Sequence, residues 1–215
     1  LDDGAGGTLF TWNAPDPLSA VWAMRMDEQG DPAWENNVDL SAGSTGTFLY
    51  GYETIAAGPG TYFTAWATED SDILLSRSNN NGTLDFSAPV SVCQDPNDQT
   101  VPRLLHHDNS LFVSWSDERP PAQERDQYVQ KFTLNGEAQW APDGIPLIQL
   151  MSTSNRVGVY PGDNGSILGT FVSTVEGYCA MRMLADGTLA WPAPVPFCTT
   201  QFEPVPWFHR ELPDG

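Results

Sequence analysis

Apolar and polar residues alternate along this chain in short runs, which is the pattern of half-buried β-strands. Four of these runs end in an aromatic residue, at 8–12, 61–66, 110–115 and 166–171. A second run follows each of them and ends at a glycine, at 20–30, 72–82, 127–136 and 178–187. No helical periodicity of useful length occurs, so the pattern predicts an all-β protein.

A glycine and a large aromatic residue, four positions apart, mark the end of each second run. The pairs are Gly30 and Trp34, Gly82 and Phe86, Gly136 and Trp140, and Gly187 and Trp191. They recur about 50 residues apart, a period typical of β-propeller blades. This regularity indicates that one supersecondary unit is repeated along the chain.

Two further strands complete each repeat. A proline-containing apolar stretch follows the aromatic residue, as at 88–92 and 192–197, and proline favours the outer edge of a sheet. An inner strand precedes the aromatic-ending run, and these inner strands are expected at 47–54, 101–107, 155–161 and 204–211. Four strands per repeat predict the four-stranded antiparallel blade of a β-propeller.

The whole chain, 1–215, is predicted to form a single propeller domain of four blades. Blade 1 takes residues 1–40 and the inner strand 204–211, whereas blades 2, 3 and 4 take 47–93, 101–148 and 155–198. We expect the C-terminal strand to complete blade 1 and close the ring, because closure removes exposed sheet edges. The alternative is a fragment of a propeller with more blades, and the sequence does not separate the two.

Composition narrows the candidate partners and the location. With 28 Asp and Glu against 9 Lys and Arg the net charge is −19, which disfavours nucleic acid and anionic membranes as partners. No run is long enough to span a bilayer, and no signal peptide is present. Because the chain starts at Leu1 and not at Met, we expect that an upstream segment was removed from a secreted or surface protein.

Cys93, Cys179 and Cys198 are expected to be small buried thiols. Cys93 and Cys198 hold the same repeat position in blades on opposite sides of a four-bladed ring, too far apart for a bridge. Cys179 and Cys198 belong to one hairpin but are about four residues out of register by counting from its turn. A bridge between those two is the alternative.

The third repeat resembles the propeller-type repeats of secreted bacterial proteins. Their pattern runs Trp-x-Asp-x-Arg, then Asp-x-Tyr-x-Gln-x-hydrophobic, then Asn-Gly, Trp, and Gly followed by Val or Ile. The matching residues here are Trp115, Asp117, Arg119, Asp126, Tyr128, Gln130, Asn135, Gly136, Trp140, Gly144 and Ile145. The resemblance implies a β-propeller and a secreted or outer-surface location in a bacterium, often within a larger multidomain chain. It implies no reaction.

Acidic turns are the candidates for bound calcium, and no other cofactor is expected. They lie between the innermost strand and the next, and their residues are Asp2, Asp3, Asp108, Asp163 and Asp214. Carboxylate and carbonyl oxygens are calcium ligands. The favoured interpretation is that Asp, Asn and Gly supply the left-handed conformations that tight hairpin turns require.

Arg103, Arg156 and Arg210 fall on three predicted inner strands. Guanidinium groups that converge on a central channel would bind a carboxylate or sulfate through bidentate hydrogen bonds. A sialidase-like site would also need a tyrosine, a glutamate and a general acid, for which the inner-strand candidates are Tyr50, Tyr52, Tyr160, Glu53 and Glu211. Two glutamates are fewer than glycosidase propellers use, and this shortage disfavours a hydrolase.

The loops that join the second strand to the third, and each blade to the next, differ in length and charge where the strands repeat. The longest, 116–126, contributes the candidate ligand-binding residues Asp117, Glu118, Arg119 and Arg125, and Trp207 is placed near the channel mouth. We therefore predict a non-enzymatic recognition or assembly module that binds a protein partner or glycan. The alternatives are a sialidase-like or lectin-like propeller that binds an acidic sugar, and a spacer domain of a surface or secretion complex.

Overall fold

The computed structural model describes residues 1, 2, 4, 6–14, 20–44, 51–120, 126–149, 153–173 and 176–198, with the backbone alone at 153–157. In this part of the chain, 15 strands form four antiparallel sheets. One short 3₁₀ turn, η2 (Asp163–Gly165), accompanies them. The all-β prediction is confirmed.

The strands of each sheet follow one another in chain order. The first sheet contains β1 (Gly7–Ala14), β2 (Ala20–Asp27) and β3 (Val38–Asp39). The second contains β4 (Tyr52–Ala56), β5 (Thr61–Ala67), β6 (Ile73–Asn79) and β7 (Val90–Cys93). The third contains β8 (Gln99–His107), β9 (Ser110–Asp117), β10 (Asp126–Thr133) and β11 (Ile145–Ile148). The fourth contains β12 (Thr153–Pro161), β13 (Ile167–Ser173), β14 (Gly177–Met183) and β15 (Val195–Cys198).

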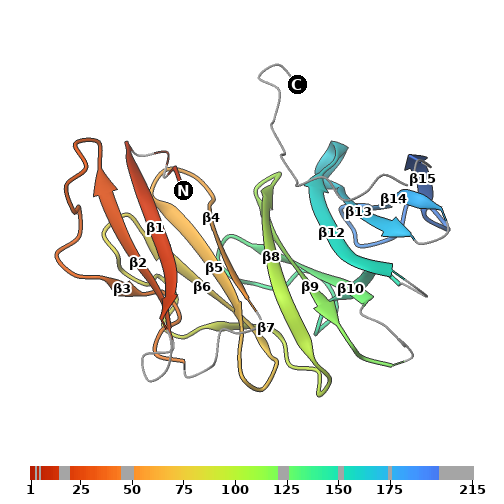
Figure 1. Cartoon of the computed structure of the whole chain (residues 1–215), viewed down its shortest axis with the longest axis horizontal. Coiled ribbons are helices and arrows are strands. Elements are labelled where there is room, and N and C mark those ends of the chain that lie inside the picture. The colour runs from red at the N-terminus through yellow and green to blue at the C-terminus, as the bar shows by residue number, and fades with distance from the viewer. Residues whose placement is uncertain are drawn as a thin grey trace.

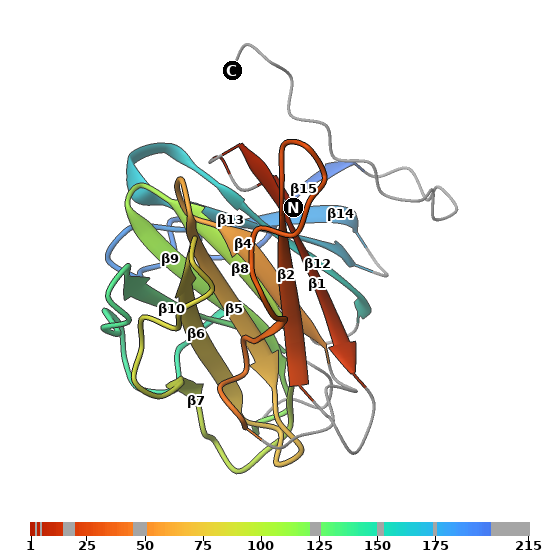
Figure 2. The same ribbon diagram turned by 90° about the vertical axis from the view of Figure 1, so that its left-hand side faces the viewer.

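The four sheets are arranged in an arc. Figure 1 shows the first sheet at one end and the fourth sheet at the other, with the inner strands β4 and β8 between them. Figure 2, turned by 90°, shows β1 and β2 in front of the fourth sheet. The strand expected at 204–211, which would close a four-bladed ring, lies outside the described residues, as does much of the inner strand expected at 47–54.

Neighbouring sheets pack face to face around three apolar clusters. Tyr62 and Trp66 of β5 contact the first sheet, whereas Phe63 and Ala65 on the same strand contact the third. The split follows from the pleat, because successive side chains of a strand point to opposite faces. A third cluster, with Phe112 on one side and Met181 on the other, joins the third and fourth sheets.

The recurring glycine and aromatic residue join one sheet to the next. A β-carbon on Gly82 would lie 3.2 Å from Trp34 of the preceding sheet, and one on Gly136 would lie 2.8 Å from Phe86. A β-carbon on Gly187 would lie 3.2 Å from Trp140. These glycines have φ of +77°, +83° and +88°, so the turn needs glycine both for its conformation and for the close approach.

Two more residues of the repeat strengthen this contact. The first residue of each outer strand adds an apolar group: Val38 contacts Gly82, Val90 contacts Gly136 and Ile145 contacts Gly187. A cation on the third strand of two sheets binds a carbonyl in the next turn: Arg77 Nη1 donates to Leu134 O at 2.9 Å, and Lys131 Nζ donates to Ala185 O at 3.1 Å. We call the aromatic residue, the outer-strand residue and the cation the blade clamp, and the glycine turn that they contact its receiving turn.

The three cysteines are free thiols; Cys93 and Cys179 are buried and Cys198 is half-buried. A register irregularity between Tyr178 and Cys179 shifts the pairing of β14 with β15. As a result Cys198 lies opposite Tyr178, the residue that precedes Cys179 on β14. The expected offset of about four residues between Cys179 and Cys198 was therefore wrong. No helix in the described part of the chain has the length and apolar character needed to cross a membrane.

Candidate functional site

Glu53 and Arg103 hold equivalent positions on two neighbouring inner strands. Glu53 on β4 lies opposite Ala65, and Arg103 on β8 lies opposite Ser114. Ala65 and Ser114 are both the fifth residue of the aromatic-ending run, at 61–66 and 110–115. Because β4 and β8 are in contact, the repeat brings a carboxylate and a guanidinium together.

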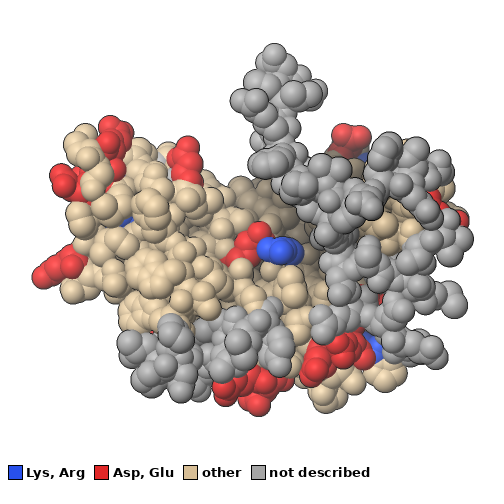
Figure 3. Space-filling model, in the orientation of Figure 1, with Lys and Arg blue, Asp and Glu red and all other residues tan. Residues whose placement is uncertain are grey.

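The two side chains form an ion pair. Arg103 Nη1 lies 3.7 Å from Glu53 Oε1, and the side chains are 55% and 30% exposed respectively. The other carboxylate oxygen of Glu53 accepts a hydrogen bond from the backbone N–H of Leu104. Figure 3 shows acidic and basic side chains meeting in a hollow at the centre of this face, over β4 and β8.

Burial raises the pKa of Glu53 above its ordinary value. The Leu104 hydrogen bond and the charge of Arg103 act in the opposite direction but do not cancel the effect of burial. A carboxyl group with a raised pKa holds its proton closer to neutral pH, as a general acid must. Glu53 therefore lies beside the N–H donors of Arg103 as a carboxyl group that keeps its proton to higher pH than an ordinary glutamate.

The third inner strand, β12, brings a glycine to the same repeat position. Gly158 lies opposite Thr170, the counterpart of Ala65 and Ser114. The space that a side chain on Gly158 would fill is taken by the ring of Tyr160. His107 Nε2 at the end of β8 donates to Gly162 O at 2.7 Å, and this bond holds the end of β8 against the turn after β12. The three inner strands thus present a carboxylate, a guanidinium and a phenol.

The predicted arginine cluster is only partly within the described structure. Arg103 lies on an inner strand as expected, and its partner is Glu53. Arg156 belongs to β12, of which the structure describes the backbone at this position. Arg210, Trp207 and Arg125 lie outside the described residues. Convergence of the three arginines on a ligand stays a prediction.

Asp117 and Arg119 form the centre of a buried polar cluster. The Asp117 carboxylate is fully buried and accepts hydrogen bonds from Trp115 Nε1 at 2.7 Å and Arg119 Nη2 at 2.6 Å. The Arg119 guanidinium lies 3.9 Å from the centre of the Tyr128 ring and donates to Asp143 O at 2.9 Å. These buried contacts indicate a structural role for Asp117 and Arg119. A ligand-binding role for the two residues stays a prediction.

The remaining loop and turn candidates lie outside the inner strands. Glu118 is exposed, and its backbone N–H donates to Asp98 O at 3.0 Å. Asp108 has a φ of +49°, which is the left-handed conformation expected of a hairpin turn. Of the other proposed calcium ligands, Asp2 and Asp163 are described, whereas Asp3 and Asp214 are not. Within the described ranges, no three His, Cys, Asp or Glu residues are grouped as metal ligands, and calcium binding stays a prediction.

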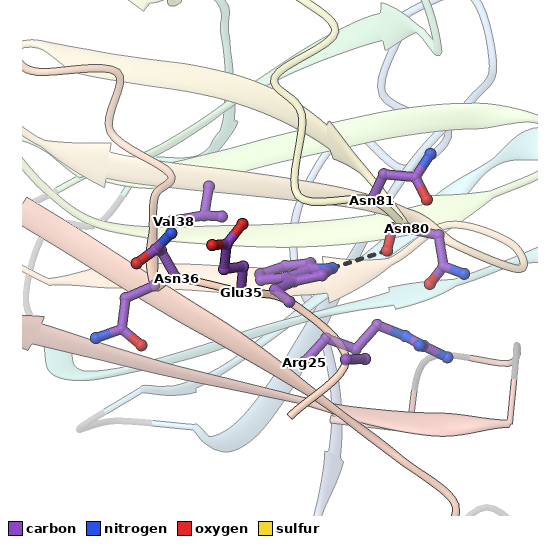
Figure 4. Close-up of a pocket in the computed structure, with 9 residues that line it drawn as sticks. Arg25, Glu35, Asn36, Val38, Asn80 and Asn81 are labelled. Atoms are coloured by element: carbon purple, nitrogen blue, oxygen red, sulfur yellow. Dashed lines mark hydrogen bonds between the residues drawn. The ribbon is translucent and has the colours of Figure 1, made fainter. Parts of the chain in front are cut away.

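A polar cavity of about 440 Å³ lies at the blade clamp between the first and second sheets. No motif in the sequence predicted this cavity. Figure 4 shows Glu35 and Val38 on one side of the cavity and Asn80 and Asn81 on the other, with a dashed line that marks the hydrogen bond at Asn80. Trp34 Nε1 donates to Asn80 O at 2.8 Å. The lining residues are Arg25, Ala33, Trp34, Glu35, Asn36, Asn37, Val38, Asn80 and Asn81.

Comparisons with known proteins support the fold. No protein-family model and no curated protein sequence matches the chain. An α-L-arabinofuranosidase of Fusarium graminearum, solved with an iminosugar inhibitor, is 14% identical with a TM-score of 0.55, over 86% of this chain and 61% of the enzyme. An α-L-arabinanase of Penicillium chrysogenum complexed with arabinobiose is 19% identical with a TM-score of 0.52, over 83% of this chain and 59% of the enzyme. The predicted β-propeller fold is confirmed, and the chain spans about three fifths of these two structures.

The same comparisons contradict the predicted non-enzymatic recognition or assembly module, and with it the prediction that the chain is not an enzyme. Both of these similar structures are glycoside hydrolases. The prediction was wrong because the number of carboxylates on the inner strands does not reveal which of them meets a charged partner. The signal for the pair is in the repeat, because Glu53 and Arg103 lie opposite Ala65 and Ser114, which hold the same repeat position.

Proposed function

We propose that this chain is a glycoside hydrolase whose sugar-binding site lies on the inner strands β4, β8 and β12. The observation that carries the proposal is the pairing of Glu53, a half-buried carboxyl with a raised pKa, with Arg103 at the equivalent position of the next sheet. The shared fold supports it, because the similar solved structures are an arabinofuranosidase and an arabinanase. Oligosaccharides of L-arabinose are accordingly the first substrates to test.

Glu53 acts as the proton donor in this proposal. Cleavage of a glycosidic bond requires a proton on the leaving oxygen and a water that attacks the anomeric carbon. Glu53 protonates the oxygen, and its raised pKa keeps it protonated at higher pH than an ordinary glutamate. Arg103 donates hydrogen bonds to the sugar and orients it against Glu53.

The attacking water requires a second carboxylate. Glu53 is the only carboxylate in the sequences of β4, β8 and β12. Glu211, on the inner strand predicted at 204–211, is our candidate for this role. Because arabinose-containing polysaccharides are too large to enter a cell intact, we also propose that the protein acts outside the cell.

The test measures hydrolysis of a chromogenic α-L-arabinofuranoside and of arabino-oligosaccharides by the purified chain. Glu53→Gln should lower kcat by at least about 100-fold, because general acid catalysis contributes about 10²–10⁴ in rate. The matched control is Asp85→Asn, which also neutralises a carboxylate paired with an arginine, here Arg77 at 3.1 Å, but away from the inner strands. Asp85→Asn should leave kcat unchanged.

Arg103→Lys keeps the positive charge and removes the planar fork, so it should raise KM more than it lowers kcat. A wild-type protein that neither binds nor hydrolyses arabinose-containing oligosaccharides would refute the proposal. Hydrolysis that survives Glu53→Gln at the wild-type rate would refute the assignment of Glu53.

A further inference from the structure

The blade clamp between the first and second sheets differs from the two that follow it in its hydrogen bonds. In the later interfaces the clamp cation, Arg77 or Lys131, donates to a carbonyl of the receiving turn. In the first interface the equivalent carbonyl, Asn80 O, accepts a hydrogen bond from Trp34 Nε1 at 2.8 Å. Arg25, at the repeat position of Arg77 and Lys131, lines the polar cavity of about 440 Å³ beside this bond. The cavity therefore lies where the clamp is built differently.

The sequence around the cavity is polar at positions where the other repeats hold mainly alanine and proline. Residues 35–37 read Glu-Asn-Asn. The equivalent segments read Ser-Ala-Pro at 87–89, Ala-Pro-Asp at 141–143 and Pro-Ala-Pro at 192–194. In the receiving turn, Asn80 holds the position that is Leu134 and Ala185 in the later sheets. Because the later interfaces form without these amides, sheet packing alone does not account for them.

Buried and exposed side chains both line the cavity. Trp34 and Arg25 are 6% and 9% exposed, whereas Glu35, Asn36 and Asn81 are exposed residues. Figure 4 shows Glu35 and Asn81 on opposite sides of the cavity. In the described part of the chain, the side chains of Glu35, Asn36 and Asn81 have no hydrogen-bond or ion-pair partner. Their donors and acceptors are therefore available to a ligand.

Two hydrogen bonds hold Asn80 in place at the cavity. Its backbone carbonyl accepts from Trp34 Nε1, and its side-chain Oδ1 accepts from Tyr62 OH at 3.2 Å. Tyr62 is fully buried between the first and second sheets, so it anchors the amide to the core. The cavity is thus formed before any ligand arrives, as small-molecule sites usually are.

The chemistry of the lining fits a neutral sugar. The side-chain amides of Asn36, Asn80 and Asn81 carry donors and acceptors together, which matches hydroxyl groups that also do both. Arg25 and Glu35 contribute opposite charges, so these two residues add no net charge to the lining. The net charge of −19 disfavours an anionic ligand. The volume of about 440 Å³ is that of a small-molecule pocket.

We propose that this cavity is a second sugar-binding site, which holds a neutral oligosaccharide without cleaving it. Cleavage takes two carboxylates, and Glu35 is the single carboxylate among the described lining residues. The site is separate from the inner strands, because β5 and β6 lie between β4 and the turn of Asn80. In the proposed hydrolase it holds a further part of a polysaccharide whose chain is cut at Glu53. That role rests on the proposed function, whereas sugar binding at the cavity does not.

The indole N–H signal of Trp34 in nuclear magnetic resonance spectra reports on the cavity. Trp34→Phe assigns the signal, and phenylalanine is the residue that the next repeat has at this position, Phe86. The Glu53→Gln variant, in which hydrolysis is slowed, is titrated with arabinotriose and with xylotriose. Either sugar should shift the Trp34 signal in a saturable manner.

A double variant, Asn36→Ala with Asn81→Ala, removes one amide from each side of the cavity. It keeps the hydrogen bond from the backbone N–H of residue 81 to Asn79 Oδ1 at 2.9 Å. The double variant should raise the Kd read from the Trp34 signal by at least about tenfold, because two hydrogen bonds to the sugar are lost. The matched control is Asn135→Ala, since Asn135 is exposed at the repeat position of Asn81 in the third sheet. It should leave the Kd unchanged.

Kinetics separate the second site from the proposed active site. The double variant should keep the wild-type kcat and KM on a chromogenic α-L-arabinofuranoside and raise the KM for polymeric arabinan. Equal losses on both substrates would overturn the separation of the two sites. A Trp34 signal that neither sugar shifts, or a Kd that the double variant leaves unchanged, would overturn the second site itself. Binding at Trp34 by a protein that hydrolyses no arabinoside would support the second site and contradict the proposed hydrolase.

Discussion

Replacing Asp117 by asparagine removes the negative charge at the centre of the buried cluster in the third sheet. In the native protein this carboxylate accepts hydrogen bonds from Trp115 Nε1 at 2.7 Å, from Arg119 Nε at 2.8 Å and from Arg119 Nη2 at 2.6 Å. The variant leaves the guanidinium, which is 15% exposed, without its main counter-charge.

Breaking a buried ion pair from one side costs about 3–5 kcal/mol. Arg119 keeps the Asp143 carbonyl at 2.9 Å, the Tyr128 ring at 3.9 Å and a distant carboxylate, Asp95, at 3.9 Å. These partners place the expected loss of unfolding free energy at the low end, about 3 kcal/mol.

Urea unfolding followed by tryptophan fluorescence measures this loss. With a urea m-value of about 2–3 kcal/mol/M, the midpoint should fall by about 1 M or more. The control is Asp85→Asn, because Asp85 and Arg77 are 28% and 26% exposed, and a partly exposed pair contributes about 1 kcal/mol or less. An Asp117→Asn loss no larger than that of Asp85→Asn would refute a structural role for the cluster. It would revive the prediction that Asp117 and Arg119 bind a ligand.

Two further predictions concern titratable groups. Because burial raises the pKa of Glu53 in the folded state, the folded protein binds this proton more tightly than the unfolded chain does. The stability of the folded protein should therefore fall as the pH rises from the ordinary pKa of 4.5 through the raised pKa. Glu53→Gln should remove that fall, as measured by thermal melts from about pH 4 to 8. A melt profile of Glu53→Gln with the same slope as wild type would contradict this origin of the slope. Burial also raises the pKa of Cys93 to about 12, so at pH 8 Cys198 should be alkylated before Cys93 in the native protein, as read by peptide mass mapping. Native labelling of Cys93 first would show that the thiol is not buried beside Arg119.

Most of the strands could be predicted because the information for them is local. The run 110–115 became β9 (Ser110–Asp117), and the run 127–136 became β10 (Asp126–Thr133) followed by its turn. Alternation sets which residues of a strand share a face, and the turn glycine sets where a strand ends. β4 was predicted less well: it was expected at 47–54 and, in the described residues, runs from Tyr52 to Ala56, which places Glu53 near its start.

The candidate site could not be predicted from local pattern. Glu53 and Arg103 are about one repeat apart in sequence, and neither has an unusual neighbourhood along the chain. Only the contact between β4 and β8 gives Glu53 a guanidinium and the Leu104 N–H as partners. For the same reason Asp117 and Arg119 looked like surface loop residues, although the fold places them against Tyr128 and Asp143.

The sequence by itself determined that this chain repeats a four-stranded sheet and that each repeat turns at a glycine followed by an aromatic residue, because strand alternation and turn conformation depend on neighbours along the chain. The tertiary structure alone decided what those recurring residues do. It showed that Phe86 packs against Gly136, the turn glycine of the next sheet, and that the inner strands pair a carboxylate with a guanidinium. Burial and the meeting of distant charges arise only when separate sheets pack together, so they leave no local signature in the sequence.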